Sequence, residues 1–322
     1  MKFTHQVRKI IQSNFEMPIT KRLKKAQEQQ KQAEETSSSS SSENDSMDEG
    51  ENSDEEIDEN EEVMIDFEAR SIEESDLESV KLLVQQKLGN FGLNVHETAK
   101  IVVQQGNIGN VIFQDPGNEN EESENTDSAA NSNEDSTIFG VLSLIDLNSP
   151  RCKNYSSAFK TFILKESQRA DKKTSKNLYE KIAEIFREKR VVYCVNERFV
   201  NIPPAISVPM FESLLTDLET AKANKNENDF ESDYWLFLSK HFETDLCGET
   251  NGSASNSDSD LIYSNAEEQV FEEFSELKFE ISCGKSTPKG SNKDAQMNSV
   301  TNCLFLPVNK IKDCIEKIKS LL

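Results

Sequence analysis

The pattern of apolar residues that predicts a folded domain begins after the first 62 residues of the chain. Over residues 63–68 apolar and polar side chains alternate, which predicts a half-buried strand because successive side chains of a strand point to opposite faces. Ser75 and Glu78 then form the pattern of a capping box, which predicts a helix that Gly89 ends. The folded part of the chain is therefore expected to open with a strand and a helix.

The rest of the pattern alternates helical periodicity with continuous apolar runs. Ile138–Leu147 and Val191–Val195 are nearly uninterrupted, which is typical of strands buried on both faces. Asn94 and Gly106 are expected to bound a second helix. Further strands are predicted at 234–242, 277–283 and 300–306, and further helices at 156–166, 175–187, 204–221, 265–274 and from 311 onward. Helices that alternate with buried strands predict an α/β domain of three layers.

Two acidic tracts without any Lys or Arg interrupt this pattern. Residues 36–62 contain 12 acids, and residues 115–135 contain 8. Such tracts bury too little apolar surface to offset the entropy cost of ordering, so we expect both to be disordered. Residues 247–260 are expected to form a flexible loop. The chain then divides into a tail, residues 1–62, and a single domain, residues 63–322, with an acidic insertion near 115–135.

The charge and hydropathy of the chain exclude several classes of protein. It has 59 acidic and 36 basic residues, a net charge of -23. An acidic chain repels nucleic acid and anionic lipid, so we expect no direct nucleic-acid binding by the core and no membrane contact. No stretch approaches the roughly 18 apolar residues that cross a bilayer. Arg8, Lys9 and Gln12 interrupt the apolar residues of the N-terminus, so we expect no signal-directed secretion.

The first 25 residues are basic, with seven Lys and Arg residues against one Glu. The cluster Lys21–Lys25 suits nuclear import. A mitochondrial transit peptide and a solvated tail are the alternatives, because apolar residues recur there at helical spacing on a cationic background.

Three serines in or beside the acidic tail have an acid three residues downstream. They are Ser42, Ser46 and Ser53, and their pattern is the one that acid-directed kinases select. Phosphorylation would add about -1.5 to -2 charges at each. An unmodified, solubilising tract fits the pattern equally well.

The chain offers little that is typical of an active site. His5, His96 and His241 are its only histidines, and the six cysteines include no CxxC pair. GxSxG, HExxH and P-loop motifs are absent. The turn Gly106–Gly109 follows a predicted helix, so we interpret it as a C-cap with a tight turn and not as a phosphate loop. We therefore expect no catalytic, cofactor-binding or metal-binding residues, and no cofactor.

The segment Arg198–Pro209 stands out because it has three prolines and few charges. Prolines fix a rigid, extended connection between the preceding strand and the following helix. A buried crossover and a preformed apolar docking surface both fit this composition. On the second interpretation its candidate partner-binding residues are Arg198, Phe199, Asn201, Pro203 and Pro204.

Several segments, taken in order, resemble the BCCIP family. They are VMIDFEARSIEESDLESVKLLVQQ, QQGNIGNVI, the acidic loop before FGVLSLIDLN, NERFVNIPPAISVPMF, DYWLFLSKHF, YSNAEEQVFEEF and the C-terminal strand and helix. Together they span Val63–Leu322, and ERFVNIPP and SNAEE are the most specific of them. The acidic N-terminal tract also fits the family.

This resemblance implies a fold like that of GNAT acetyltransferases, with a mixed sheet flanked by helices. It also implies a chaperone or escort that resides in the nucleus, shuttles to the cytoplasm and is not an enzyme. The implied client is a basic ribosomal protein of the large subunit. A phosphatidylinositol phosphate kinase exported from the nucleus and nuclear transport factors are further implied partners, and animal members are partners of a DNA-repair tumour suppressor and a cyclin-kinase inhibitor.

Acidic side chains are the candidate contacts with a basic client, because a ribosomal protein has a surface suited to RNA phosphate. In the tail they are Asp48, Glu49, Asp54, Glu55, Glu56, Asp58, Glu59, Glu61 and Glu62, and in the insertion Glu121, Glu122 and Glu124. Two other functions remain open: a scaffold for cell-cycle and repair proteins, and an acyl-CoA-dependent transferase. The second lacks its phosphate-binding pattern of Arg or Gln, two spacers, Gly, one spacer, and Gly or Ala.

Overall fold

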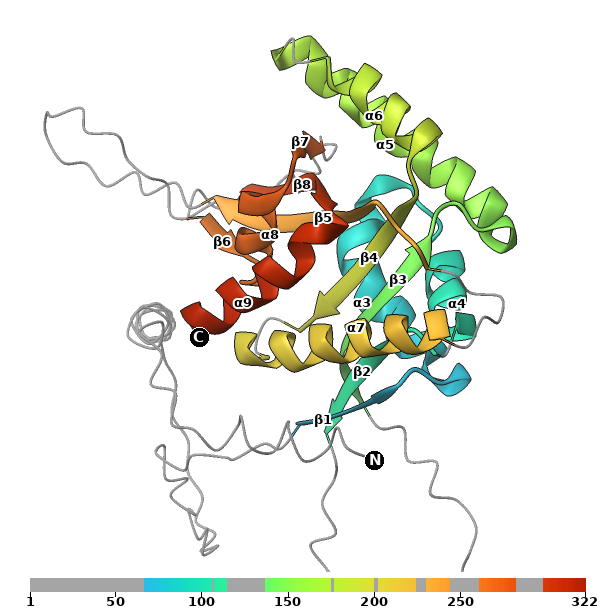
Figure 1. The fold of residues 1–322 in the computed structure, drawn as a ribbon, viewed down its shortest axis with the longest axis vertical. Coiled ribbons are helices and arrows are strands. Elements are labelled where there is room, and N and C mark those ends of the chain that lie inside the picture. Colours follow the sequence, from blue (N-terminus) through green and yellow to red (C-terminus); the bar gives the residue numbers. More distant parts are fainter. Residues whose placement is uncertain are drawn as a thin grey trace, which may run out of the picture. The chain divides into compact units, whose positions relative to one another are not determined.

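Eight strands of the described residues form one mixed sheet (Figure 1). The computed structural model describes residues 67–105, 107–114, 137–174, 177–199, 202–223, 230–243, 261–281 and 298–322. The tail, the acidic insertion and the loop 247–260 lie outside the described residues, so the expectations about them stay predictions. The strands are β1 (Phe67–Ser71), β2 (Gly109–Gln114), β3 (Ile138–Asp146), β4 (Val191–Arg198), β5 (Tyr234–Glu243), β6 (Leu261–Tyr263), β7 (Leu277–Ile281) and β8 (Asn298–Pro307).

The sheet has the strand order β1-β2-β3-β4-β5-β8-β7, and β6 pairs with the end of β5. All neighbours run antiparallel except β4 and β5, which run parallel. A parallel pair requires a crossover connection, and helix α7 (Ser207–Ala223) provides it between β4 and β5. The sheet is therefore antiparallel on both sides of one parallel junction.

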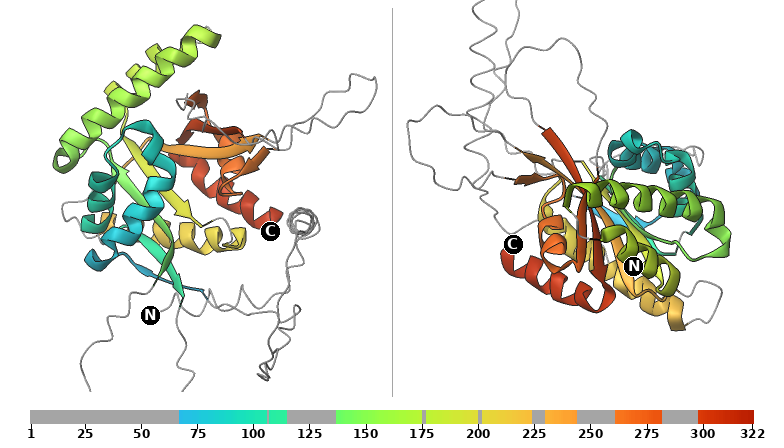
Figure 2. Two further views of the ribbon diagram at one scale, coloured as in Figure 1. Left: turned by 180° about the vertical axis from the view of Figure 1, so that it is seen from behind. Right: turned by 90° about the horizontal axis from the view of Figure 1, so that it is seen from above.

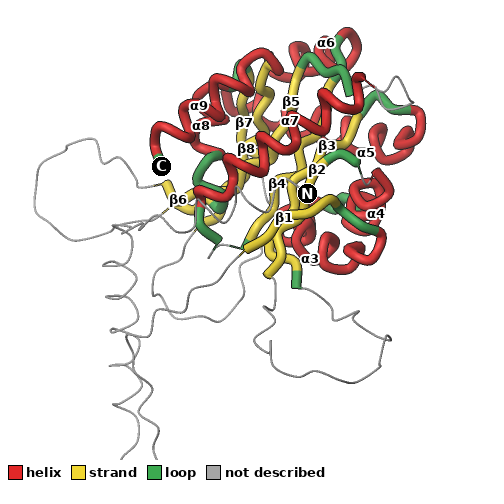
Figure 3. The backbone as a smooth tube through the Cα atoms, turned by 60° about the horizontal axis from the view of Figure 1, so that its bottom comes forward, coloured by secondary structure: helices red, strands yellow, loops and turns green. Residues whose placement is uncertain are grey.

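Helices cover both faces of the sheet, as Figures 2 and 3 show. One hydrophobic core lies under α3 (Leu77–Leu88), α4 (Val95–Gln105), α5 (Lys153–Thr174) and α6 (Leu178–Glu188). The second lies under α7, α8 (Glu268–Phe274) and α9 (Ile311–Leu321). This arrangement confirms the predicted three-layer α/β fold with a mixed sheet between helices.

Strand β4 shows why the long apolar runs predict central strands. Every residue of β4 is buried. Tyr193 faces the core under α3, and Cys194 faces the core under α7, so both faces of the strand need apolar side chains. The predicted strands at Ile138–Leu147 and Val191–Val195 are both confirmed, although β4 continues to Arg198.

The start of α3 differs from the predicted capping box. The box is formed by Glu73 and Asp76, whose carboxylate accepts the Glu73 backbone N–H at 2.8 Å. Asp76 also binds both terminal nitrogens of Arg70 at 2.8 Å. A 3-10 turn precedes the helix, so the prediction of Ser75 and Glu78 is wrong.

The other predicted caps have mixed outcomes. Gly89 is confirmed as the residue at which α3 ends, although it has right-handed backbone angles and opens a 3-10 turn. The glycine with left-handed angles is Gly92, which ends that turn with a φ of 68°. Asn94 is confirmed as the cap of α4, because its side-chain oxygen accepts the Glu97 N–H at 3.0 Å.

Strand β2 was not predicted. Gly109 opens it with a φ of 113°, and a Cβ atom there would overlap the carbonyl oxygen of Leu142 on β3. The turn was interpreted as the end of a helix, and α4 does end at Gln105. Gly109 also begins strand β2, which pairs with β1 and β3. The apolar run that follows is too short to identify a strand alone.

Helix α5 is longer at both ends than the predicted 156–166. Its added C-terminal turns are mostly polar, and their helical state is maintained by packing against α6, as at Ala170 in the core. Figure 1 shows α5 and α6 side by side along one margin of the described domain.

We expect Gly109→Ala to lower the free energy of unfolding by about 2 kcal/mol or more, because the substitution adds backbone strain and a steric overlap. Gly92→Ala is the matched control, since Gly92 also has positive φ but an added Cβ would meet nothing within 4 Å. The control should cost about 1 kcal/mol. Urea unfolding followed by Trp235 fluorescence measures both, and equal losses would contradict the role given to Gly109.

Candidate functional site

The parallel junction of the sheet opens into a fork. Strands β4 and β5 pair only from Val191 with Tyr234 to Tyr193 with Leu236. Beyond this point the strands diverge (Figure 1), and β5 pairs instead with β6. Backbone groups on the facing edge of β4 thus have no strand partner among the described residues, and buried groups of this kind need other hydrogen bonds.

The turn before α8 supplies one of these hydrogen bonds. Asn265 is buried, and its side-chain amide donates to the carbonyl oxygen of Asn196 on β4 at 2.9 Å. Lys87, which α3 brings from the opposite face, donates to the same carbonyl at 3.3 Å. Side chains of the protein therefore satisfy the Asn196 carbonyl on the strand edge that the fork leaves open.

Lys87 also forms two buried ion pairs. Its Nζ lies 3.0 Å from a carboxylate oxygen of Glu197 and 3.1 Å from one of Glu268. All three side chains are buried, and Glu268 is fully so. Glu268 also accepts a hydrogen bond from Asn265 at 3.0 Å. One ammonium group thus links α3, β4 and the start of α8.

A second buried ion pair continues the network. Arg198 lies 2.6 Å from Glu267, and both side chains are buried. The other oxygen of Glu267 accepts the Asn196 amide at 3.0 Å. We call the seven residues the fork network; they are Lys87, Asn196, Glu197, Arg198, Asn265, Glu267 and Glu268.

The fork network contains three carboxyl groups and two cations. Burial raises the pKa of Glu197 to about 7, an effect that the attraction of Lys87 only partly offsets and that Glu268 reinforces. Burial acts to lower the pKa of Lys87, but the two carboxylates outweigh it and raise that pKa above its ordinary value. Lys87 therefore stays charged. Protonation of Glu197 would leave two carboxylates opposite the two cations.

The structure separates the predicted partner-binding residues. Arg198 is buried in its ion pair, so its guanidinium is not on the surface. Phe199 is half-buried against Phe139, Pro203 is exposed, and Pro204 is half-buried at the start of the turn into α7. Asn201 and all twelve acidic candidates lie outside the described residues. Partner binding by these residues stays a prediction.

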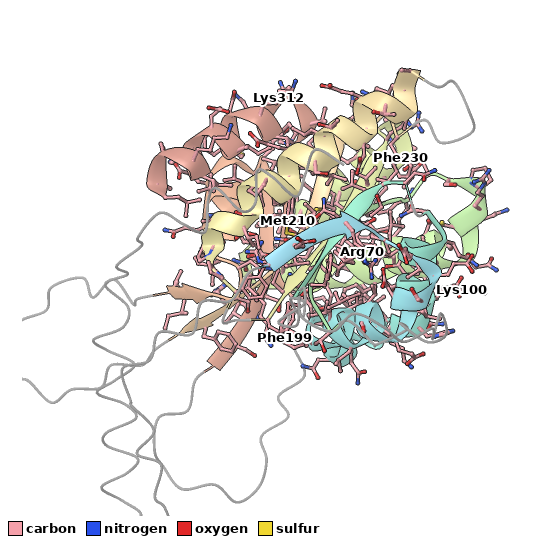
Figure 4. The ribbon with its side chains drawn as sticks, turned by 90° about the horizontal axis from the view of Figure 1, so that it is seen from below. Arg70, Lys100, Phe199, Met210, Phe230 and Lys312 are labelled. Atoms are coloured by element: carbon pink, nitrogen blue, oxygen red, sulfur yellow. The ribbon has the colours of Figure 1, made fainter. Side chains whose placement is uncertain are left out.

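The segment Arg198–Pro209 forms the start of the crossover from β4 to α7. Ile202 and Ile206 are buried in the core under α7. Figure 4 shows Phe199 and Met210 near the two ends of this segment. The described part of the segment therefore has the features of a buried crossover, with Pro203 as an exposed point.

Of the seven members of the fork network, sequence reasoning singled out only Arg198. It missed Lys87, Asn196, Glu197, Asn265, Glu267 and Glu268. Lys87 is 181 residues from Glu268, and no local pattern connects residues so far apart. The available signal was that ERFVNIPP and SNAEE are the most specific segments of the resemblance. The structure shows that these two segments meet in one buried network.

Other possible sites carry less chemistry. The described residues contain no group of three or more His, Cys, Asp or Glu side chains that could hold a metal ion. Cys194, Cys303 and Cys314 are buried free thiols, as expected of small apolar residues. None of the described helices is long and apolar enough to cross a membrane.

A cavity of about 530 Å³ lies between α7, the start of β5 and α9. Leu218, Phe230 and Trp235 contribute apolar walls, and Lys312 is among its charged lining residues (Figure 4). Its bases and acids occur in equal number, so the cavity has no charge preference.

Comparison with known proteins identifies the family. The BCCIP family model matches residues 62–271. The chain belongs to the BCCIP family. It is 32% identical over 269 residues to the Protein BCCIP homolog of Drosophila melanogaster, which covers 81% of this chain and 85% of that protein. It is 31% identical over 271 residues to the BRCA2 and CDKN1A-interacting protein of Bos taurus, with 81% and 84% covered.

Two fungal proteins are also similar to this chain. Protein bcp1 of Schizosaccharomyces pombe is 24% identical over 182 residues, with 56% of this chain and 57% of that protein covered. The crystal structure of BCP1 from Saccharomyces cerevisiae matches with 18% identity and a TM-score of 0.47, covering 83% of this chain and 93% of that chain.

We expect Lys87→Met to lower the free energy of unfolding by about 3–5 kcal/mol at pH 8, because it leaves two buried carboxylates without their cation. Lys81→Met on the same helix is the matched control. Lys81 pairs with Glu78 on the surface, and such a pair contributes about 0.5 kcal/mol. Urea unfolding of both variants tests the fork network, and similar losses would contradict it.

The stability of the protein should also depend on the ionisation of Glu197. Its pKa is about 7 in the folded state against an ordinary value of 4.5, so the folded state binds the proton more tightly. The resulting stabilisation is complete below about pH 4.5 and is lost as the pH rises through 7, a change on the order of 3 kcal/mol. Glu197→Gln should match the wild type at pH 5.5 and exceed its unfolding free energy at pH 8.5. A wild type that is the more stable protein at pH 8.5 would show that pairing with Lys87 outweighs burial.

Proposed function

We propose that this protein is a non-enzymatic nuclear chaperone that binds a basic client, a ribosomal protein of the large subunit. It keeps the client soluble, supports ribosome assembly and shuttles between nucleus and cytoplasm. A phosphatidylinositol phosphate kinase and nuclear transport factors are further proposed partners. The observation that carries the proposal is the joining of a BCCIP domain to 20 acids in two tracts without any base.

Electrostatics gives this proposal a mechanism. A ribosomal protein carries a basic surface that binds RNA phosphate, and before assembly that surface attracts stray RNA. Two acidic tracts supply the same kind of charge on a soluble partner. They would accelerate encounter through their field and release the client when RNA competes for the same cations. The folded domain would then supply specificity through contacts that salt affects less.

The fork network argues against the transferase alternative. An extended ligand bound between the diverging strands needs free backbone groups there, but Lys87 and Asn265 already donate to the carbonyl oxygen of Asn196. The buried ion pairs hold these side chains in place. The family is also named for interacting with other proteins. Micromolar binding of acetyl-CoA in calorimetry would instead favour the transferase.

A scaffold for repair and cell-cycle proteins is the second candidate. It is favoured by the name of the Bos taurus relative, the BRCA2 and CDKN1A-interacting protein. The two functions differ in what they predict for a basic client. A scaffold binds its partners without keeping an aggregating ribosomal protein in solution, so a light-scattering assay of client aggregation separates them.

We expect the acidic tracts to act mainly on the rate of association with the client. Raising the salt concentration beyond about 0.15 M, where the Debye length is about 8 Å, should slow association more than it speeds dissociation. Deleting residues 36–62 and neutralising the acids of residues 115–135 should lower both the association rate and its salt dependence. A weaker, salt-tolerant complex made by the folded domain should remain. Stopped-flow mixing of the purified pair measures these rates.

Deletion of the basic N-terminal residues 1–25 is the control for loss of chain length. It removes seven cations and one acid, and should leave the association rate the same or higher. If the association rate changes neither with salt nor with loss of the acids, the acidic tracts do not attract the client and serve only to keep the protein soluble.

A further inference from the structure

Helix α5 has an exposed face without any carboxylate. Its exposed side chains are five cations, two amides, two hydroxyls and one alanine. The cations are Lys153, Lys165, Arg169, Lys172 and Lys173. In a chain with 59 acidic residues, a helix of 22 residues with such a face is a marked departure from the average composition.

The two acids of α5 do not neutralise these lysines. Glu166 is buried and pairs with Arg169. Asp171 accepts the backbone N–H groups of Leu178 and Tyr179 at 2.6 and 2.8 Å, which caps the start of α6. Both carboxylates are therefore held by contacts other than the four exposed lysines.

The lysines of α5 also lack ion-pair partners elsewhere in the described part of the chain. Outside the segment Arg151–Arg190, nine of the twelve described Lys and Arg residues form an ion pair. On α5, Lys153, Lys165, Lys172 and Lys173 form none with a described residue. The dipole of the helix accounts for two lysines in the last turn, but not for Lys153 and Lys165.

The geometry of the helix aligns these charges. Lys165, Arg169 and Lys172 follow the i, i+4, i+7 spacing, so they lie on one side of the helix. At about 1.5 Å per residue, the cations from Lys153 to Lys173 extend over about 30 Å. The opposite side of α5 is fixed to the sheet by Phe159 and Ile163 in the core. Helix α5 thus holds these charges in fixed positions at the margin of the domain (Figure 2).

We propose that the exposed face of α5 binds the sugar–phosphate backbone of double-helical RNA. Lys, Arg, amide and hydroxyl side chains are the groups that contact phosphate and sugar oxygens. The proposal rests on the proposed function, because RNA is the destination of a ribosomal client.

The composition of the face favours RNA over an acidic peptide. None of the large exposed hydrophobic side chains of the described residues belongs to α5. A peptide interface depends on buried apolar or aromatic anchors, and this face has none to offer. Single-stranded RNA is recognised largely by stacking on aromatic rings, whereas duplex RNA is recognised by its shape and its phosphates. A row of cations without an exposed ring therefore fits the duplex.

The net negative charge of the whole chain does not prevent this binding. It led to the expectation of no direct nucleic-acid binding, but net charge is an average over segments of opposite sign. At about 0.15 M salt the Debye length is about 8 Å, so acids remote from α5 are largely screened from a bound duplex. Contact with three or four phosphates gives a dissociation constant on the order of 10 μM and a slope of about -3 in a plot of log K against log salt.

The test is fluorescence anisotropy of a labelled RNA duplex of about 20 base pairs, long enough to cover a 30 Å helix, with the full chain. The α5 variant carries Lys153→Gln, Lys165→Gln, Lys172→Gln and Lys173→Gln. The control variant removes four exposed lysines from other elements: Lys100→Gln, Lys222→Gln, Lys310→Gln and Lys312→Gln. Both variants lose the same net charge, and unfolding curves verify that both are folded.

We expect the α5 variant to bind the duplex about ten-fold more weakly or worse and with a smaller salt slope, and the control variant to stay within about two-fold of the wild type. Equal losses in the two variants would overturn the proposal, as would a wild type that prefers single-stranded RNA, duplex DNA or a poly-glutamate peptide. Client association by stopped flow in the same variants separates the two proposals. A wild type that binds the client but not the RNA duplex would remove the inference, and one that binds the duplex but not the client would remove the proposed function.

Discussion

The carbonyl oxygen of Asn196 must find hydrogen-bond donors at a point where its strand has lost a neighbour, and much of the domain is arranged around this requirement. Asn196 is buried, and the donors that it finds come from the protein. Lys87 arrives from the layer above the sheet and Asn265 from the layer below it. A buried ammonium in turn requires carboxylates, which explains why Glu197 and Glu268 are buried beside it.

Such a network is a poor source of net stability, because the cost of removing charges from water largely cancels their attraction. Its effect is on geometry. The network joins α3 to α8 through the plane of the sheet, so each layer is positioned relative to the other by charged contacts with defined directions. Apolar packing alone would tolerate a shift between these layers. The arrangement fixes how two segments far apart in the sequence meet, and it closes the fork from both faces.

Local patterns in the sequence were sufficient for most of the fold. Long apolar runs identified β3 and β4, and helical periodicity identified the α-helices of the described residues, since each signal depends only on neighbouring residues. Strand β2 is short and depends on Gly109 for its entry, while β6 has three residues and exists because β5 continues beyond β4. The fork network could not be predicted, since the hydrogen bonds between its three segments join residues that are at least 69 apart in the sequence. Arg198 was placed on a possible docking surface because sequence composition cannot distinguish a paired, buried arginine from an exposed one.

The position of β8 between β5 and β7 has a consequence for the order in which the chain can fold. β8 pairs with β5 over ten residues and with β7 over five, yet it follows both in the sequence. During synthesis the earlier strands leave the ribosome with open edges, and open edges are prone to pair with other chains. Strand β8 also completes both hydrophobic cores. Phe305 belongs to the core under α3–α6, and Leu304 and Leu306 belong to the core under α7–α9. The chain is thus itself exposed to aggregation until its last strand has been made, and this hazard is the one from which we propose that it protects its client.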